Sequence, residues 1–399
     1  DPDDGFTTTP GRVTLLSFPV GTGVRVDANR RVGDRIEQTD SLLAIVTAWG
    51  PDRAVALTRI RRALERTAVV IENGTTNLSF LLALLDDEQF QSDEVDHRWL
   101  DRMIADRPPP EPDPLVLLAG AVEAYEADRR RAQEAFYASA ERGRPQQPDE
   151  VGSGIELGYL GESYRLDVDC IGPRTYSVRS GRTVAHVTVD RLNEYERRLT
   201  CAGRRHRLVV SPTEFGFRLQ VGHASHVIQR EDGVLVRAGW PALIVSTLIQ
   251  PGDVVAEGQA IAVLESMKME TTVVAPFAGV VLDILVTANS QVERGAALLR
   301  LRPQISTGVS PTGRRIDLSG FEREIDFSRK PCDRVYEPLG DYLLGYDLAP
   351  AELRRLLTEQ RRLAEIADAA DSSLLACEDS LLDIYAELGS LYRPQTETE

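Results

Sequence analysis

Lys268 is the residue whose type and setting most clearly suggest chemistry. The chain contains 44 arginines but only two lysines, Lys268 and Lys330. Lys268 stands between Met267 and Met269, which are two of the three methionines in the chain. Methionine is usually a gap-filling residue of a hydrophobic core, and an exposed turn has no core to fill. A surface that a modifying enzyme recognises explains the methionine pair better, whereas we interpret Lys330 as a solvated surface charge.

A repeat of 37 residues surrounds Lys268 and predicts how it is positioned. Within residues 240–303, Val245 matches Leu282, Gly258 matches Gly295, and other pairs follow at the same offset. Two similar β halves that each expose an apolar face would bury those faces against each other, which predicts a flattened sandwich of about eight short strands with quasi-twofold symmetry. Strand-like runs at 262–264 and 272–274 flank the methionine pair, so we expect a hairpin turn with Lys268 at its tip.

This region resembles the biotin carboxyl carrier domain. The residues that carry the resemblance are Pro251-Gly252-Asp253, Met267-Lys268-Met269, Pro276 and Gly279. In that family a biotin protein ligase attaches biotin to the lysine through an amide, so the resemblance implies covalent biotin on Lys268. Asn289 stands where the second half often has glycine, and asparagine can adopt the same left-handed conformation. The lipoyl domain has a similar fold, but its lysine usually follows aspartate and lacks the methionine pair, so we favour biotin over lipoate.

Residues 1–106 resemble the C-terminal part of biotin carboxylase. The shared strings are Pro10-Gly11, Gly23-Val24-Arg25-Val26-Asp27, Ala48-Trp49-Gly50-Pro51-Asp52-Arg53, Arg62-Ala63-Leu64 and Thr75-Thr76-Asn77. In that family the arginine of Gly-Val-Arg contacts the carboxylation intermediate and biotin, which implies a catalytic role for Arg25. Taken without the resemblance, a lone arginine is a surface charge. The family's ATP-binding part would lie upstream, so ATP, Mg and bicarbonate are expected to bind a part absent from this chain.

Local patterns predict the remaining elements. Strands are expected at 13–18, 24–27 and 68–71, with Asp52 as the N-cap of a helix and further helices at 77–85 and 95–104. A proline-rich break at 108–114 precedes one long helix over 115–142. Between 155 and 236, alternation of apolar and polar residues predicts short antiparallel strands in a small barrel or sandwich, with the long helix covering an end or an edge. From Val335 the pattern is helical.

These observations divide the chain into four expected parts and give a multidomain α+β fold. The resemblance implies that residues 1–106 are the α/β C-terminal part of an ATP-grasp-type biotin carboxylase. Residues 107–236 are expected to form a connecting domain of long helix plus antiparallel β-barrel, which resembles the one in acyl-CoA carboxylases. The resemblance makes residues 237–303 the expected carrier domain, a biotinyl/lipoyl-like sandwich. Residues 304–399 are expected to be a linker and an all-α segment leading towards a carboxyltransferase. Because the chain starts at Asp1 without methionine, we expect a piece of a longer protein.

Composition argues against several other functions. A net charge of −16 disfavours a nucleic-acid partner, and no apolar run is long enough to span a membrane. The chain's four cysteines are widely scattered without metal-ligand spacing, which predicts a reducing, cytoplasmic setting. His223 and His226 would face opposite sides of a strand. No metal site is therefore predicted.

The resemblance as a whole implies a biotin-dependent acyl-CoA carboxylase of the single-chain, multidomain type. Biotin on Lys268 would be carboxylated with ATP and bicarbonate. The carboxyl group would then pass to acetyl-, propionyl- or a longer-chain acyl-CoA, giving malonyl-CoA or a homologue. The implied partners are the biotin carboxylase core and carboxyltransferase domain of the same enzyme, in a homo-oligomer. The alternative that stays open is a carrier or scaffold piece of another biotin-dependent carboxylase or decarboxylase, acting on pyruvate or urea.

Overall fold

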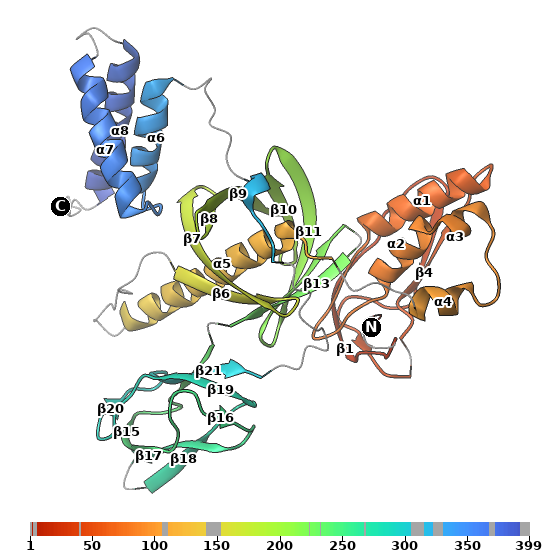
Figure 1. Cartoon of the computed structure of the whole chain (residues 1–399), viewed down its shortest axis with the longest axis horizontal. Helices are drawn as coiled ribbons and strands as arrows, with labels where there is room; N and C mark the ends of the chain where they lie inside the picture. Colours follow the sequence, from red (N-terminus) through yellow and green to blue (C-terminus); the bar gives the residue numbers. More distant parts are fainter. Residues whose placement is uncertain are drawn as a thin grey trace, which may run out of the picture. The chain divides into compact units, whose positions relative to one another are not determined.

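The computed structural model describes residues 2, 6–39, 41–105, 111–140, 153–222, 224–231, 233–266, 269–304, 315–321, 330–366 and 372–391. Its internal contacts separate the chain into two compact units, and the strands of one barrel belong partly to each. Figure 1 labels the helices and strands. Each part is described by itself, in the order of the chain.

The N-terminal part combines short antiparallel sheets with helices. One sheet has the order β3-β1-β5, and β2 pairs separately with β4. The Asp52 side chain accepts a hydrogen bond from the Val55 amide at 2.8 Å, which confirms the predicted N-cap of α1. Strands β3 and β4 and helix α3 have no counterpart in the sequence-based prediction. The element bounds are β1 Gly11–Ser17, β2 Val24–Ala28, β3 Arg35–Ile36, β4 Ala44–Ala48, α1 Arg53–Arg66, β5 Ala68–Ile71, α2 Leu78–Asp86, α3 Glu88–Ser92 and α4 Trp99–Ala105.

The middle of the chain forms a closed antiparallel barrel, as the alternating sequence pattern predicts. Its strands follow each other around the barrel in the order β10-β11-β12-β13-β6-β7-β8-β9. In β7 every second residue from Tyr164 to Cys170 is buried, so one face of the strand points inward. The strands are β6 Ser153–Tyr159, β7 Glu162–Gly172, β8 Thr175–Ser180, β9 Thr183–Arg191, β10 Glu196–Cys201, β11 Arg204–Thr213, β12 Gly216–Val221 and β13 Ala224–Arg230.

The long helix α5, Pro114–Ala140, occupies the inside of this barrel (Figure 1). All eleven residues from 115 to 125 are buried, which covers three full turns and every side of the helix. Glu123 hydrogen-bonds Arg197 of β10, Glu126 accepts from Tyr176 of β8, and Gly120 faces Ile228 of β13. Because these strands are spread around the barrel, the helix must lie within it. The prediction that this helix covers an end or an edge was wrong.

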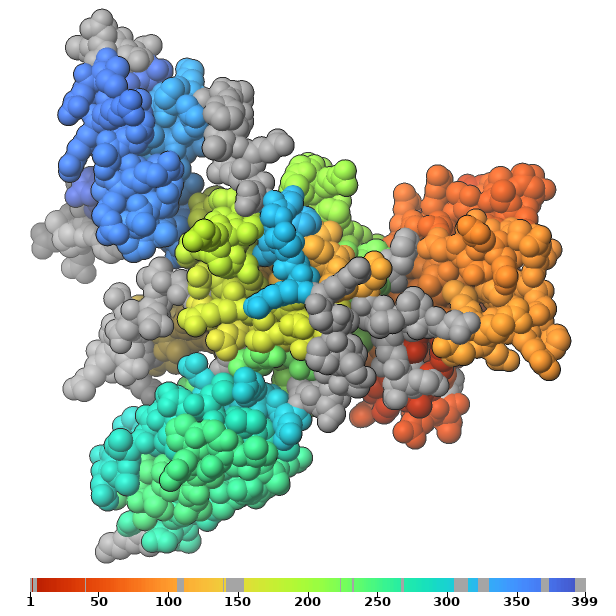
Figure 2. Space-filling model, in the orientation of Figure 1, coloured from red at the N-terminus to blue at the C-terminus, as the bar shows by residue number. Residues whose placement is uncertain are grey.

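Residues 234–303 form the predicted eight-stranded sandwich. One sheet has the order β14-β21-β19-β16 and the other β18-β17-β15-β20. The 37-residue repeat is exact at three strand pairs, since β19, β20 and β21 begin 37 residues after β15, β16 and β17. Figure 2 shows the sandwich as one closely packed body on the face in view. Its strands are β14 Val234–Arg237, β15 Ala242–Thr247, β16 Val254–Val255, β17 Ala260–Ser266, β18 Met269–Val274, β19 Gly279–Ile284, β20 Gln291–Val292 and β21 Ala297–Pro303.

The C-terminal part is helical, as the leucine spacing predicts. A short 3₁₀ turn, η1 Ser319–Phe321, precedes α6 Pro331–Leu343, α7 Pro350–Ile366 and α8 Ser372–Leu391. The helices pack around a core that includes Val335, Tyr336, Leu339 and Leu356. Most of the predicted linker, 304–331, lies outside the described residues. Among the helices within the described ranges, none has the length and apolar character needed to cross a bilayer.

Candidate functional site

The hairpin between β17 and β18 holds the predicted modification site. Ser266 and Met269 are the last partners in the antiparallel register of these strands, so β17 and β18 form a hairpin with two residues between their paired ends. Those two residues are Met267 and Lys268, which both lie outside the described residues. The antiparallel pairing of β17 with β18 confirms the hairpin that the sequence predicts, and the place of Lys268 at its tip stays a prediction. Figure 1 shows β17 and β18 running side by side to one end of the sandwich.

The flanks of this turn are held on one side and open on the other. The Ser266 hydroxyl donates a hydrogen bond to the Pro241 carbonyl at 3.2 Å, which ties the end of β17 to the loop before β15. Next to the turn, Met269 keeps 71% of its surface exposed. An exposed methionine beside a tight hairpin is not filling a core. This end of the hairpin therefore fits a lysine that a modifying enzyme must reach, and covalent biotin is compatible with it.

Matching turns in the two halves of the sandwich support the hairpin. Gly252 has φ of 96° and Asn289, 37 residues later, has φ of 65°. The prediction that Asn289 adopts the left-handed conformation in place of glycine is thus confirmed. A second pair, Gly258 and Gly295, has φ of 78° and 85°. These positive angles let each half turn tightly, so that the strands on either side of the modification hairpin return to the core.

Arg25, the predicted catalytic residue, lies on the exposed face of β2. Its guanidinium donates two hydrogen bonds to one carboxylate oxygen of Asp27, at 3.0 and 2.8 Å. The side chain remains 70% exposed, and the hydrogen bond to Asp27 raises the pKa of Arg25 above its ordinary value. Arg25 is thus a permanent cation on an open surface. Because Lys268 lies outside the described residues, the structure gives no distance between the two predicted site residues.

Of the two histidines that the sequence analysis considered, the structure describes only His226. His226 is buried, and its Nδ1 pairs with the Tyr159 hydroxyl at 2.9 Å. The same hydroxyl oxygen accepts a hydrogen bond from the Asp113 amide at 3.1 Å. His226 is therefore part of a hydrogen-bonded pair in the interior of the barrel. His223 lies outside the described residues.

A cluster that sequence spacing did not reveal lies in the helical part. Cys332 and Asp333 near the start of α6 meet Cys377 of α8, and both thiols donate to the same carboxylate oxygen of Asp333. Burial, together with the nearby Cys332 and Asp333, raises the pKa of the Cys377 thiol to about 12. Sequence spacing carries little signal here, because 44 residues separate Asp333 from Cys377. Only the packing of α6 against α8 brings them together.

Comparisons with protein-family models match two separate parts of the chain. Residues 1–102 match the biotin carboxylase C-terminal domain. Residues 231–301 match the family described as biotin-requiring enzyme, which covers the sandwich and its hairpin. The second match assigns a biotin-binding role to the domain that holds the Met-Lys-Met turn. Both matches agree with the resemblances found in the sequence.

Similarities to whole proteins cover more of the chain than either family match. The acetyl-CoA carboxylases 1 of Oryza sativa subsp. japonica and Arabidopsis thaliana are each 26% identical over 287 residues, which is 70% of this chain and 13% of each relative. A solved single-chain, multi-domain long-chain acyl-CoA carboxylase is 19% identical, with 75% of this chain and 18% of that chain covered, at a TM-score of 0.23. That score is too low to support an argument about fold. The chain therefore carries a biotin carboxylase C-terminal domain and a domain of the biotin-requiring enzymes, and it is homologous to acetyl-CoA carboxylase.

Proposed function

We propose that this chain is the biotin-carrying segment of an acyl-CoA carboxylase and that Lys268 holds the biotin. The observation that carries the proposal is the hairpin of β17 and β18, whose last paired residues, Ser266 and Met269, flank Lys268 in a sandwich that matches the biotin-requiring enzymes. The exposed flank at Met269 supports a lysine that a modifying enzyme can reach at this place. When attached there, biotin supplies a ring nitrogen that carries CO2 between two reaction sites.

The four sequence-derived parts extend this proposal to the whole chain. Residues 1–106 complete a biotin carboxylase whose ATP-binding part lies on another segment, and Arg25 contacts biotin there. Residues 107–236 connect it to the carrier at 237–303, and residues 304–399 lead to a carboxyltransferase. A tethered carrier raises the local concentration of its group at both sites, provided that its linkers span the distance. A biotin protein ligase, a homo-oligomeric assembly and a cytoplasmic location belong to the same proposal.

An acyl-CoA substrate is favoured over pyruvate or urea by the extent of the similarity. The match to the acetyl-CoA carboxylases covers 287 residues, more than the two family matches together. It therefore includes sequence outside the two modules that biotin-dependent enzymes share. The test is the complete enzyme supplied with acetyl-CoA, propionyl-CoA, a long-chain acyl-CoA, pyruvate or urea. Carboxylation of an acyl-CoA supports the proposal, and activity on pyruvate or urea alone contradicts it.

Intact mass spectrometry tests the attachment site directly. The chain produced together with a biotin protein ligase is expected to gain the mass of one biotinyl group. Lys268→Arg should abolish that gain, because a guanidinium cannot form the biotinyl amide. Lys330→Arg is the matched control, since it removes the other lysine of the chain, and it should retain biotin. A lipoyl mass, or biotin that survives Lys268→Arg, contradicts the proposal.

A further inference from the structure

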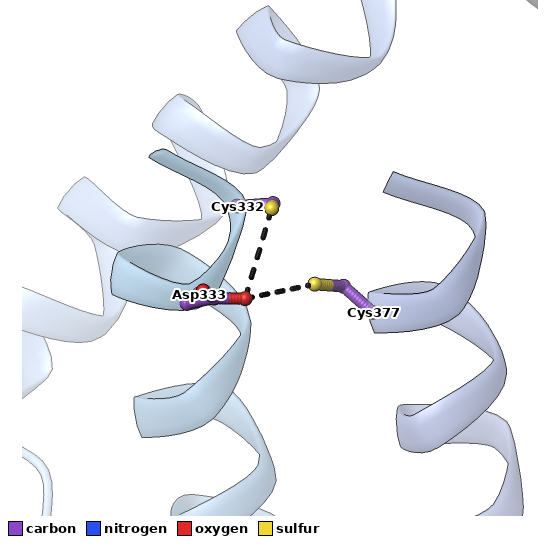
Figure 3. Close-up of side chains that lie close together, drawn as sticks. All are labelled: Cys332, Asp333 and Cys377. Carbon is purple, nitrogen blue, oxygen red and sulfur yellow. Dashed lines mark hydrogen bonds between the residues drawn. The ribbon is translucent and has the colours of Figure 1, made fainter. Parts of the chain in front are cut away.

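We propose that Cys332, Asp333 and Cys377 form a zinc site that fastens α6 to α8 in the C-terminal helical part. Among the residues that the structure describes, these three offer ligand atoms that all lie within 4.8 Å of one another. Figure 3 shows the carboxylate of Asp333 between the two sulfur atoms, with one sulfur contributed by each helix. Two of the ligands are neighbours in sequence, and the third comes from a different helix.

The distances in the cluster fit a tetrahedral metal. The Asp333 Oδ1 atom lies 3.8 Å from Cys332 Sγ and 3.5 Å from Cys377 Sγ. A zinc ion with bonds of about 2.3 Å to sulfur and 2.0–2.2 Å to oxygen places those ligand atoms roughly 3.6 Å apart on the edges of a tetrahedron. The observed spacings therefore need only small side-chain adjustments. Thiolate ligands also select a soft or borderline cation over magnesium or calcium.

The surroundings of the cluster favour a cation. Cys332 and Asp333 lie in the first turn of α6, where the amide dipoles stabilise the deprotonated ligands, and the acidic residues beside the cluster attract the cation itself. Next to the cluster is an open cavity of 610 Å³, lined by Asp333 and Cys377 and also by Glu337 and Asp341. The cavity gives an ion access from solvent and leaves room for water as the fourth ligand. Lys330 at its edge is the one basic residue among those that line it.

A metal at this point would do more than the hydrogen bonds that it replaces. The S–H···O contacts are long, and thiols are weak donors. A zinc ion would instead cross-link helices whose ligands are 44 residues apart in sequence, and its binding energy would add to the stability of the folded segment. The site would therefore be structural, with its effect confined to the packing of α6 against α8.

The test measures zinc on the whole chain kept under reducing conditions. We expect one zinc per chain by elemental analysis, and competition with a chromophoric chelator should give its affinity. Co²⁺ in place of zinc should produce thiolate-to-cobalt charge-transfer absorption, which only sulfur ligation generates. Cys332→Ser and Cys377→Ser should each weaken binding at least about tenfold and lower that absorption, and the double variant should remove it. Asp333→Asn should weaken binding while retaining the absorption.

Two control variants distinguish the loss of a proposed zinc ligand from a general effect of removing a thiol or a carboxylate. Cys201→Ser removes a buried thiol of the barrel, and Asp341→Asn removes a carboxylate of the same cavity outside the proposed ligand set. Both should keep wild-type zinc affinity. Circular dichroism checks that each variant is folded, and the cobalt spectrum of the wild-type chain does not depend on any variant. Failure to bind zinc, unchanged binding in both cysteine variants, or a Cys332–Cys377 disulfide in the reduced preparation would overturn the proposal.

Discussion

At the scale of single residues, Asn289 shows how the two halves of the sandwich tolerate different sequences. Its φ of 65° is that of a position where glycine is most easily accommodated, and Gly252 fills the equivalent place in the first half. The backbone N–H of Asn289 also donates a hydrogen bond to the Ile244 carbonyl at 2.7 Å, so the turn is tied to β15. Asn289 therefore occupies a left-handed turn position in which most other side chains would be strained.

Two substitutions of Asn289 test this requirement for a left-handed backbone conformation. Asn289→Val should destabilise the sandwich by about 1–2 kcal/mol, because a β-branched side chain is strained in the left-handed region. Asn289→Gly should leave stability nearly unchanged and serves as the control. Amide hydrogen exchange followed by mass spectrometry reads the effect in peptides from 242–303 alone. Equal exchange in the two variants would contradict the conformational explanation.

At the scale of elements, an ion pair deep in the barrel joins α5 to β10. Arg197 donates two hydrogen bonds to the Glu123 carboxylate, at 2.6 and 3.2 Å, and its side chain is only 6% exposed. It also donates to the backbone carbonyls of Asn193 and Glu194. Because both charged groups are buried away from water, removing either one leaves the other without a counter-charge.

Removing one member of this ion pair should lower the stability of the barrel. Glu123→Ala should destabilise the barrel by about 3–5 kcal/mol, because it leaves a buried guanidinium without its counter-charge. The matched change Glu352→Ala breaks an exposed pair with Arg355 on α7 and should cost less than about 1 kcal/mol. Urea unfolding with peptide-resolved hydrogen exchange distinguishes the two regions. A similar small loss in both variants would show that the buried pair contributes no more than a surface one.

The same elements show what sequence alone could predict. Local signals were enough for the Asp52 cap, the alternating strands and the Met-Lys-Met hairpin, because each depends on residues close in sequence. The place of α5 was missed, although residues 115–122 are all apolar or glycine and so already indicate a helix buried on every side. The meeting of Cys332 and Cys377 had no such signal, since it depends on how α6 and α8 pack.

At the scale of the whole molecule, the proposed reaction needs parts that this chain does not contain. The chain spans 13% of the length of the acetyl-CoA carboxylases that it matches. Arg25 can therefore be tested only in the complete enzyme. Its open position on β2 leaves the guanidinium free of any surrounding core and available to a partner that arrives from outside the domain.

Arg25→Ala in the complete enzyme should slow bicarbonate-dependent carboxylation of biotin by about a hundredfold or more, the usual effect of losing a donor to developing negative charge. Biotinylation of Lys268 should be unchanged, because it takes place on a separate domain. Arg98→Ala, an exposed arginine of the same domain, is the control and should keep full activity. Wild-type carboxylation by the Arg25 variant would remove it from the proposed site.

The helix inside the barrel also fixes an order of events during folding. The barrel closes where β13 pairs with β6, as in the contact of Ile228 with Tyr159, so the ring cannot be complete before residue 230 has been synthesised. By then α5 has already left the ribosome. The helix has to be enclosed while the strands assemble, because a closed barrel could not admit it afterwards. Such long-range pairing makes folding slow. The apolar surface of α5 is therefore exposed until the final strand arrives, and this interval is when the nascent chain is most open to aggregation.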